Sequence, residues 1–160
     1  MVNSKLDKID LSILKDLQAE GRLTNVELSK RAGISAPPCL RRVKDLEDEG
    51  VIESYHAVLN QHALGFTVTI FAEVALSSQN DADLRGFEEQ VQKWPLVREC
   101  YMVTGGTDFL LKIVAQDFDA YQNFLSTELS TMIKVANIKT RMVIRTAKNL
   151  PGIPIDLYQG

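Results

Sequence analysis

The sequence is poor in cysteine and has no long apolar run, and these two absences exclude several classes of protein. Cys39 and Cys100 are the only cysteines among 160 residues and form no Cys-x-x-Cys pair, so nothing predicts a disulfide framework. No apolar stretch approaches the roughly 20 residues that span a bilayer, and the N-terminal residues lack the apolar core of a signal peptide. We therefore expect a cytoplasmic protein that does not bind membranes.

Motifs of catalysis and of metal binding are missing as well. The chain has no Gly-rich phosphate loop before a helix, no Ser/His/Asp set and no paired carboxylates in an obvious cleft. Asp81 and Asp83 are explained as helix-start residues, where negative charge is favourable. His56 and His62 fit no ligand spacing with either cysteine, and both cysteines are interpreted as packing residues. We expect no enzyme activity, no metal site and no cofactor.

The overall charge is nearly balanced, which argues against a protein that is basic over its whole surface. The formal net charge is −3, and a content of 45% hydrophobic and 24% charged residues is typical of a packed, soluble protein. A local basic patch is compatible with these totals, because the field near a surface depends on where the charges lie. The length of 160 residues suits one domain or two small ones.

The N-terminal third of the chain carries apolar residues at helical spacing. The apolar residues within 6–18 fall on one face of a predicted helix, and residues 24–32 predict a second, short helix. Thr24 and Glu27 have the spacing of a capping box, in which each side chain accepts from the other residue's backbone amide. Gly33 is placed to end this second helix.

Two prolines mark the start of a third helix. Ser35 suits the N-cap position, which puts Pro37 and Pro38 in the first turn, where amides lack intrahelical partners and proline costs little. This helix is predicted to end at Gly50. Three short helices with a tight Gly-containing turn between the second and third are the plan of the helix-turn-helix. In that plan the third helix meets base edges in the major groove of DNA.

Basic residues gather in this region although the total charge is not basic. Residues 1–60 hold nine Lys and Arg against ten Asp and Glu, a net charge of −1. The stretch between Glu27 and Asp45 nevertheless contains no acid and five basic residues, namely Lys30, Arg31, Arg41, Arg42 and Lys44. The charge of this part is therefore polarised, with the acids of the third helix confined to its rear half.

The basic residues of the third helix are interpreted as DNA contacts. Arg41 and Lys44 lie roughly opposite its apolar face, and their alternative role is a solvated helix surface. Phosphate contacts position a protein on DNA, whereas an arginine can also read a guanine edge, so Arg41 is the candidate for base contact. Arg42 lies on the flank and either contacts DNA or pairs with Asp45, Glu49 or an acid of the first helix. The full set of expected DNA contacts is Thr24, Asn25, Ser35, Ala36, Pro37, Arg41, Arg42 and Lys44.

The second half of the chain has a different periodicity of apolar residues, which begins after a linker expected at residues 60–67. The predicted elements are a strand at 68–76, a helix at 81–94, strands at 97–104 and 108–115, a helix at 117–131 and a strand at 137–146. This order, β-α-β-β-α-β, is that of the ferredoxin-like fold. The expected organisation is therefore a DNA-binding domain at 1–59, the linker, a second domain at 68–148, and a tail at 149–160 that is mobile or wrapped on a partner.

One face of the predicted sheet is expected to lack a covering layer. In this fold the helices cover a single face, and the other face is predicted to carry apolar side chains, namely Phe71, Ala75, Met102, Leu110 and Val114. An uncovered apolar face marks an interaction surface. We expect an oligomer in which sheets pack together.

The sequence resembles the family of the leucine-responsive regulatory protein and the asparagine-synthase regulator (Lrp/AsnC), also called feast/famine regulators. The similarity covers about residues 5–148 and is most specific in LDKIDLSILKDLQAEGRLTNVELSKRAGIS, PPCLRRVKDLEDEGVIESYHAVLN and VTGGTDFLLKIV. It implies an α+β protein with an N-terminal all-α (winged) helix-turn-helix followed by a ferredoxin-like βαββαβ domain, called the RAM domain. It also implies a sequence-specific transcriptional regulator of double-stranded DNA, whose homodimers assemble further, often into octamers.

Many members of that family bind an amino acid between dimers, and the resemblance transfers this site residue by residue. The turn Gly105, Gly106, Thr107 and Asp108 matches one part, and Thr140, Arg141 and Met142 match a last-strand segment that borders the pocket. Two positions depart from the pattern: Gly106 stands where many members have an acidic or polar residue, and Ile133-Lys134 replaces a frequent Pro-Gly. The alternative function is an architectural protein that wraps DNA without a ligand.

Overall fold

The computed structural model describes residues 6–158 and divides the chain into two compact units. The first unit comprises Met1–Val58 together with Lys148–Gly160, and the second comprises Leu59–Ala147. The polypeptide therefore passes between the units twice. No helix among the described residues combines the length and the apolar character needed to cross a membrane.

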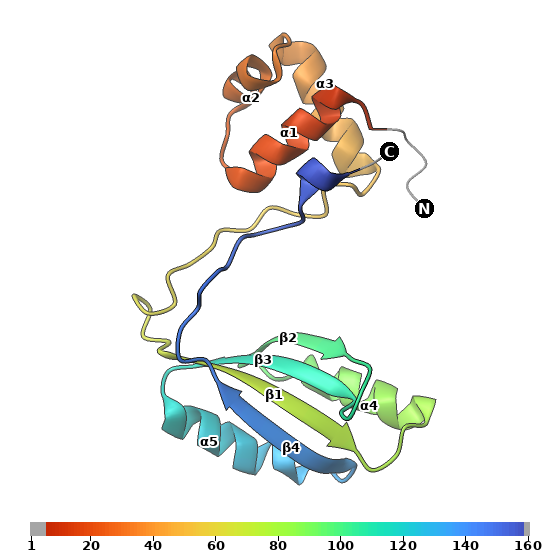
Figure 1. The fold of residues 1–160 in the computed structure, drawn as a ribbon, viewed down its shortest axis with the longest axis vertical. Coiled ribbons are helices and arrows are strands. Elements are labelled where there is room, and N and C mark those ends of the chain that lie inside the picture. Colours follow the sequence, from red (N-terminus) through yellow and green to blue (C-terminus); the bar gives the residue numbers. More distant parts are fainter. Residues whose placement is uncertain (1–5, 159–160) are drawn as a thin grey trace. The chain divides into compact units, whose positions relative to one another are not determined.

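The first unit contains three helices, α1 (Lys8–Ala19), α2 (Asn25–Ala32) and α3 (Ala36–Asp48) (Figure 1). The expected capping box is present at α2, where the Glu27 amide donates to Thr24 Oγ1 at 3.2 Å and the Thr24 amide donates to Glu27 Oε2 at 3.0 Å. Gly33 ends α2 in the left-handed conformation with φ of 70°. The turn that leads into α3 is thus set by local sequence, as expected.

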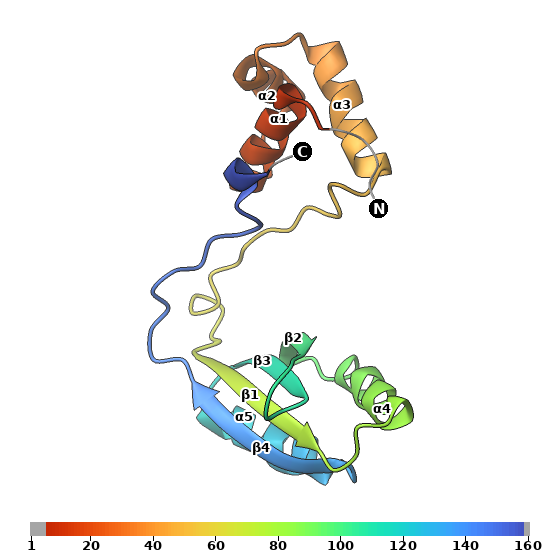
Figure 2. The same ribbon diagram turned by 45° about the vertical axis from the view of Figure 1, so that its right-hand side comes forward.

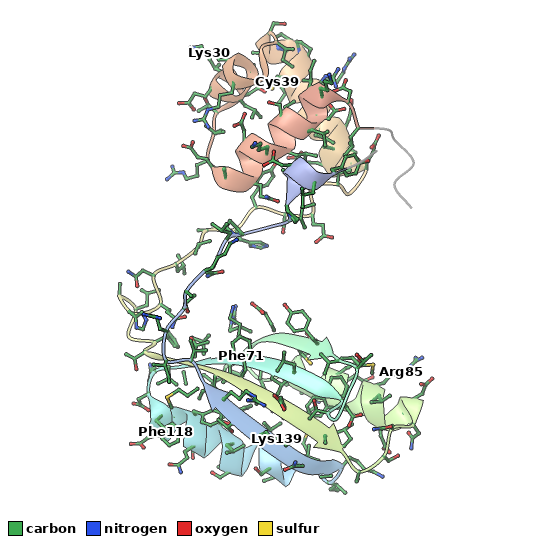
Figure 3. All side chains as sticks on the ribbon, in the orientation of Figure 1. Lys30, Cys39, Phe71, Arg85, Phe118 and Lys139 are labelled. Carbon is green, nitrogen blue, oxygen red and sulfur yellow. The ribbon has the colours of Figure 1, made fainter. Side chains whose placement is uncertain are left out.

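A small core joins these three helices. Its buried residues are Ile13, Leu28, Cys39 and Leu46. Cys39 is fully buried between the helices, and burial raises the pKa of its thiol (Figure 3). A buried thiol that stays protonated is unreactive, which agrees with the packing role predicted for this cysteine.

The C-terminal tail packs against α1 of the same chain. Gln18 Nε2 donates to the carbonyl oxygen of Ile153 at 2.8 Å, and the Ile153 amide donates back to Gln18 Oε1 at 2.9 Å. Lys15 Nζ lies 2.7 Å from Asp156 Oδ1, and a short 3-10 helix, η2 (Ile155–Leu157), lies beside α1 (Figures 1 and 2). The tail was expected to be mobile or to wrap on a partner, and the structure instead places it on its own helix-turn-helix unit.

The second unit is a four-stranded antiparallel sheet with two α-helices. Its elements are β1 (Val68–Leu76), α4 (Asp81–Val91), β2 (Val97–Met102), β3 (Phe109–Ala115), α5 (Phe118–Thr127), the 3-10 helix η1 (Leu129–Thr131) and β4 (Val135–Met142). The strand order is β2-β3-β1-β4. This is the expected β-α-β-β-α-β arrangement.

The last strand begins and ends earlier than predicted. It was expected at residues 137–146, but β4 ends at Met142, which pairs with Ile70. The Val143 amide makes one further bond, to the carbonyl oxygen of Thr69, and β1 begins only one residue before that. β4 therefore ends where β1, its partner strand, begins, because no further backbone groups of β1 are available for pairing.

Helices α4 and α5 both lie on one face of this sheet (Figure 2). Buried residues alternate along β1 and β3 and point toward them, among them Ile70, Val74, Phe109 and Leu111. The ring of Phe109 stacks on that of Phe87 from α4, with centroids 4.6 Å apart. Burial of one sheet face fixes which side chains are left on the other.

The opposite face, which we call the open face, carries no helix within the described residues. Phe71, Ala75, Leu110 and Val114 lie on it as expected, and Figure 3 labels Phe71 and Lys139 there. The prediction for Met102 is wrong, because it pairs with the buried Phe109 and so lies on the helix side. Two ion pairs, Lys112–Glu99 at 2.7 Å and Arg141–Glu73 at 2.6 Å, are interspersed among the apolar side chains.

Candidate DNA-binding and effector sites

Arg41 and Lys44 extend from the exposed side of α3 and are available for a ligand. Both side chains are exposed, and neither makes an ion pair or a hydrogen bond with the described part of the chain. They lie about one helical turn apart, which is the spacing of neighbours on a helix face. Two unpaired cations on one face of the third helix are suited to DNA phosphates and to a base edge.

Arg42, the next residue along the helix, has a different role. Its Nη1 lies 2.6 Å from Asp10 Oδ1 and 2.8 Å from Asp7 Oδ2, and its side chain is only 27% exposed. These contacts raise the pKa of Arg42, the hydrogen bond that it donates to Asp10 most of all. The pKa of the Asp7 carboxyl is lowered, chiefly by the backbone amide of Asp10 and further by Arg42. Of the two roles considered for Arg42, the structure shows the pairing with acids at the start of α1, which leaves its guanidinium less free for DNA than those of Arg41 and Lys44.

Arg31 is also occupied within the protein. Its Nη2 lies 2.8 Å from Glu20 Oε2, and its Nη1 lies 3.8 Å from Asp16 Oδ1. Of the five basic residues between Glu27 and Asp45, this leaves Lys30, Arg41 and Lys44 without an ion-pair partner among the described residues. The sequence could not make this distinction, because the acids that neutralise Arg31 and Arg42 lie in α1 or next to one of its ends, far from α2 and α3 in sequence.

The remaining candidates for DNA contact surround the turn between α2 and α3. Thr24 is engaged in its capping box, and the Asn25 side-chain amide donates to the carbonyl oxygen of Ala36 at 2.8 Å. These two residues therefore fix the geometry of the turn, while Asn25 Oδ1 is buried and accepts no hydrogen bond from the described residues. Ser35 differs, because it occupies the N-cap position of α3 but makes no side-chain cap bond.

The prolines explain why the Ser35 hydroxyl is free. An N-cap side chain accepts from the amides two or three residues ahead. In α3 those positions are Pro37 and Pro38, which have no amide hydrogen. The serine hydroxyl is exposed at the start of α3 and remains available for a ligand.

The expected effector turn leaves several amides free. Gly105 adopts φ of 121°, and the amides of Gly105, Gly106 and Thr107 have no acceptor within the described residues. Asp108 anchors the turn, because its Oδ2 accepts from the Leu76 amide at 2.7 Å. Its Oδ1 accepts from Gln79 Nε2 at 2.8 Å. Gln79 was missed by the sequence analysis, because nothing in the chain predicts that the loop after β1 reaches the turn after β2.

The second expected part of the effector site does not join the first within one chain. Met142 lies opposite Ile70 on β1, whereas Asp108 bonds to Leu76. At about 3.3 Å per residue, the step along β1 from Ile70 to Leu76 is about 20 Å. The three residues also separate by face, since Thr140 bonds to the Tyr121 hydroxyl on the helix side while Arg141 pairs with Glu73 on the open face.

Comparison with known proteins decides the family. A model described as "Lrp/AsnC ligand binding domain" matches residues 69–153, and one described as "Winged helix-turn-helix DNA-binding" matches residues 6–53. The chain belongs to the Lrp/AsnC family. Each of the two matches falls mainly on one structural unit, the helix-turn-helix on the first and the ligand-binding domain on the second.

Individual Lrp/AsnC proteins match over nearly the whole chain. The leucine-responsive regulatory protein of Rhizobium meliloti is 48% identical over 155 residues, which cover 97% of this chain and 99% of that protein. The leucine-responsive regulatory protein of Escherichia coli is 40% identical over 154 residues, covering 92% and 94%. A transcriptional regulator of Neisseria meningitidis, solved as a complex with L-Met, aligns with a TM-score of 0.91 at 37% identity, covering 95% of this chain and 98% of that one.

Membership of the Lrp/AsnC family gives the protein its general activity. It is a DNA-binding transcriptional regulator with a ligand-binding domain, and the family consists of regulators rather than enzymes. Within residues 6–158 no cluster of His, Cys, Asp and Glu could hold a metal ion, and burial raises the pKa of Cys100 to about 11, so its thiol stays protonated at neutral pH.

Proposed function

We propose that this regulator acts in the cytoplasm, that an amino acid controls its binding to specific DNA, and that the amino acid binds at the turn Gly105–Asp108. Three neighbouring amides of that turn lack acceptors within the described residues, and this observation carries the proposal. Consecutive free amides form a concave site that suits an anion such as an α-carboxylate. A family relative from Neisseria meningitidis has been solved as a complex with L-Met, which supports an amino acid as the ligand class.

Asp108 would complete recognition of the amino acid by attracting its ammonium group. Both carboxylate oxygens already accept one hydrogen bond, from Leu76 and from Gln79. A carboxylate offers about four acceptor sites, so capacity remains on each oxygen. The two existing bonds would hold the carboxylate in place before the ligand arrives.

The site would be completed by a second copy of the chain. Thr140–Met142 pair with β1 residues that lie four to six positions from Leu76, the residue that Asp108 contacts, which is about 13–20 Å along the strand. The open face, with Phe71 and Leu110 beside two ion pairs, is suited to pack on a second copy. We propose a homodimer through this face, whose dimers assemble further and bring the two parts of the site together.

A thermal-shift panel with the twenty amino acids tests the effector proposal. A ligand at 100 times its Kd that binds only the native state stabilises it by about 2.7 kcal/mol. For a chain of this size that corresponds to a rise in Tm of about 5–10 °C. A flat panel would overturn the effector proposal and favour the architectural, ligand-independent alternative.

Two variants locate the site once a ligand has been found. Thr107→Val removes a hydroxyl that has no partner within the described residues, so the fold should be unaffected while the thermal shift falls. Gln79→Ala removes a support of Asp108 and should also reduce the shift. If both variants respond like the wild type, the pocket lies elsewhere. Sedimentation with and without the ligand shows whether assembly changes with binding.

A further inference from the structure

The exposed side of α3 is apolar in its N-terminal half. Pro37, Leu40, Arg41 and Lys44 follow the i, i+3, i+4, i+7 spacing of a single helix face, so two apolar side chains adjoin the two unpaired cations. Leu40 is 59% exposed and takes no part in the core of its unit. Isolated exposed leucines are common on protein surfaces, but this one lies in the middle of the face that meets DNA.

The first turn of α3 offers few hydrogen-bond donors to DNA. Helix N-termini usually bind phosphate through free amides. Here Pro37 and Pro38 have no amide hydrogen, and the Cys39 amide donates to the Ser35 carbonyl oxygen at 3.2 Å. Of the amides in this turn, only that of Ala36 has no acceptor among the described residues. The turn therefore presents mainly hydrocarbon, from the Pro37 ring to the Leu40 side chain one turn later.

We propose that Leu40, supported by Pro37, reads the C5-methyl group of thymine in the major groove. Thymine alone among the four bases presents a methyl group there, and apolar side chains contact it. Arg41 and Lys44 lie beside Leu40 on the same face and supply the base-edge and phosphate contacts. Leu40 is thus a specificity residue for DNA binding, and this assignment does not depend on the proposed effector.

Replacement of thymine by uracil tests the proposal, because these bases differ only by the methyl group. An operator is first selected from random DNA with the full-length protein, and each thymine of one half-site is then replaced singly by deoxyuridine. Affinity is measured at one fixed salt concentration, because phosphate contacts make binding strongly salt-dependent. We expect one or two positions at which deoxyuridine weakens wild-type binding about fourfold, the factor for burying one methyl-sized group.

Variants of α3 assign the effect to a side chain. In Leu40→Ala, binding should be weaker and the deoxyuridine effect at those positions should fall to less than about 1.5-fold, as a double-mutant cycle requires for groups in contact. Leu40→Met keeps an apolar side chain and should retain the fourfold effect, as should Arg41→Ala, which tests a neighbouring contact.

Three results would overturn the assignment. The first is an operator in which loss of no thymine methyl weakens wild-type binding. The second is a Leu40→Ala variant with the same deoxyuridine sensitivity as the wild type. The third is a clearly lowered Tm of Leu40→Ala, which would make this exposed leucine a structural residue instead.

Discussion

At the scale of single residues, two adjacent arginines of α3 perform different tasks. Arg41 is exposed and unpaired within the described residues, whereas Arg42 pairs with Asp7 and Asp10 at the N-terminus of α1. A helix turns about 100° per residue, so neighbours in sequence do not share a face. The guanidinium group of Arg41 therefore points toward solvent, whereas that of Arg42 points toward α1.

This difference predicts opposite outcomes for the two alanine variants. Arg41→Ala should weaken operator binding by about 1–3 kcal/mol, the usual effect of losing a base-reading arginine, and leave thermal stability unchanged. Arg42→Ala should lower the free energy of unfolding by about 1–2 kcal/mol, because it breaks charged hydrogen bonds between helices. Fluorescence anisotropy with operator DNA and thermal denaturation measure the two effects.

Each arginine variant is the control for the other, since both remove the same side chain from the same helix. Affinity of Arg42→Ala must be measured below its Tm, so that unfolding does not appear as weak binding. Unchanged binding by Arg41→Ala would remove that residue from the interface.

At the scale of one element, the start of α3 combines a good N-cap residue with an environment in which it cannot cap. Ser35 has the extended conformation of an N-cap, with φ of −77° and ψ of 158°. Pro37 and Pro38 remove the two amides that its hydroxyl would accept from. The prolines stabilise the helix start through their fixed φ, and they leave the serine hydroxyl without a cap bond.

A double-mutant cycle tests this account of the helix start. Ser35→Ala should be neutral for stability in the wild type, because no cap bond exists to lose. In a Pro38→Ala background the amide at position 38 is restored, the serine can cap, and Ser35→Ala should cost about 1 kcal/mol. Chemical denaturation of the four proteins gives the cycle. A cost for Ser35→Ala of that size in the wild type would contradict the account.

At the scale of the whole molecule, the C-terminal tail returns the chain to the unit in which it began. Residues 59–147 form the ligand-binding unit, and Lys148–Gly160 belong with the helix-turn-helix. The paired hydrogen bonds of Gln18 and Ile153 and the ion pair of Lys15 and Asp156 hold the tail on α1. The ligand-binding unit is consequently joined to the DNA-binding unit at both of its own ends, Leu59 and Ala147.

Gly152 is the position at which this docking is most sensitive. Its φ is 74°, and an added Cβ would lie 2.1 Å from Gln18 Oε1. Gln18 cannot move aside without losing both of its bonds to Ile153. Gly152→Ala should therefore release the tail, at a cost that includes about 1 kcal/mol for an alanine in the left-handed region.

Hydrogen exchange at the Ile153 amide measures the release of the tail. Its exchange rate should rise at least about tenfold in Gly152→Ala, which corresponds to about 1.4 kcal/mol of lost protection. Gly86→Ala is the matched control, because that helical glycine has no atom within 4 Å of an added Cβ and no left-handed backbone. Unchanged exchange at Ile153 would show that the tail is not held by these contacts.

Local rules in the sequence determined which elements form. The capping box of Thr24 and Glu27, the left-handed Gly33 and the alternation of Val68–Leu76 each act over a few residues, and all three appear in the structure as predicted. The order of strands and helices then indicated the β-α-β-β-α-β arrangement before any contact was known. The family resemblance rested on stretches that include the capping box and Gly33, and it is confirmed by the comparisons.

Only the tertiary structure decided which side chains are free to act. Arg31 and Arg42 are neutralised by acids in or beside α1, Asp108 is held by Gln79 from another loop, and the tail docks on α1 through contacts between Gln18 and Ile153. Met102 lies on the helix side of the sheet because the register of β2 against β3 places it opposite Phe109. Each of these outcomes depends on residues that are distant in sequence, and pairing between distant residues leaves no periodic signal in a single chain.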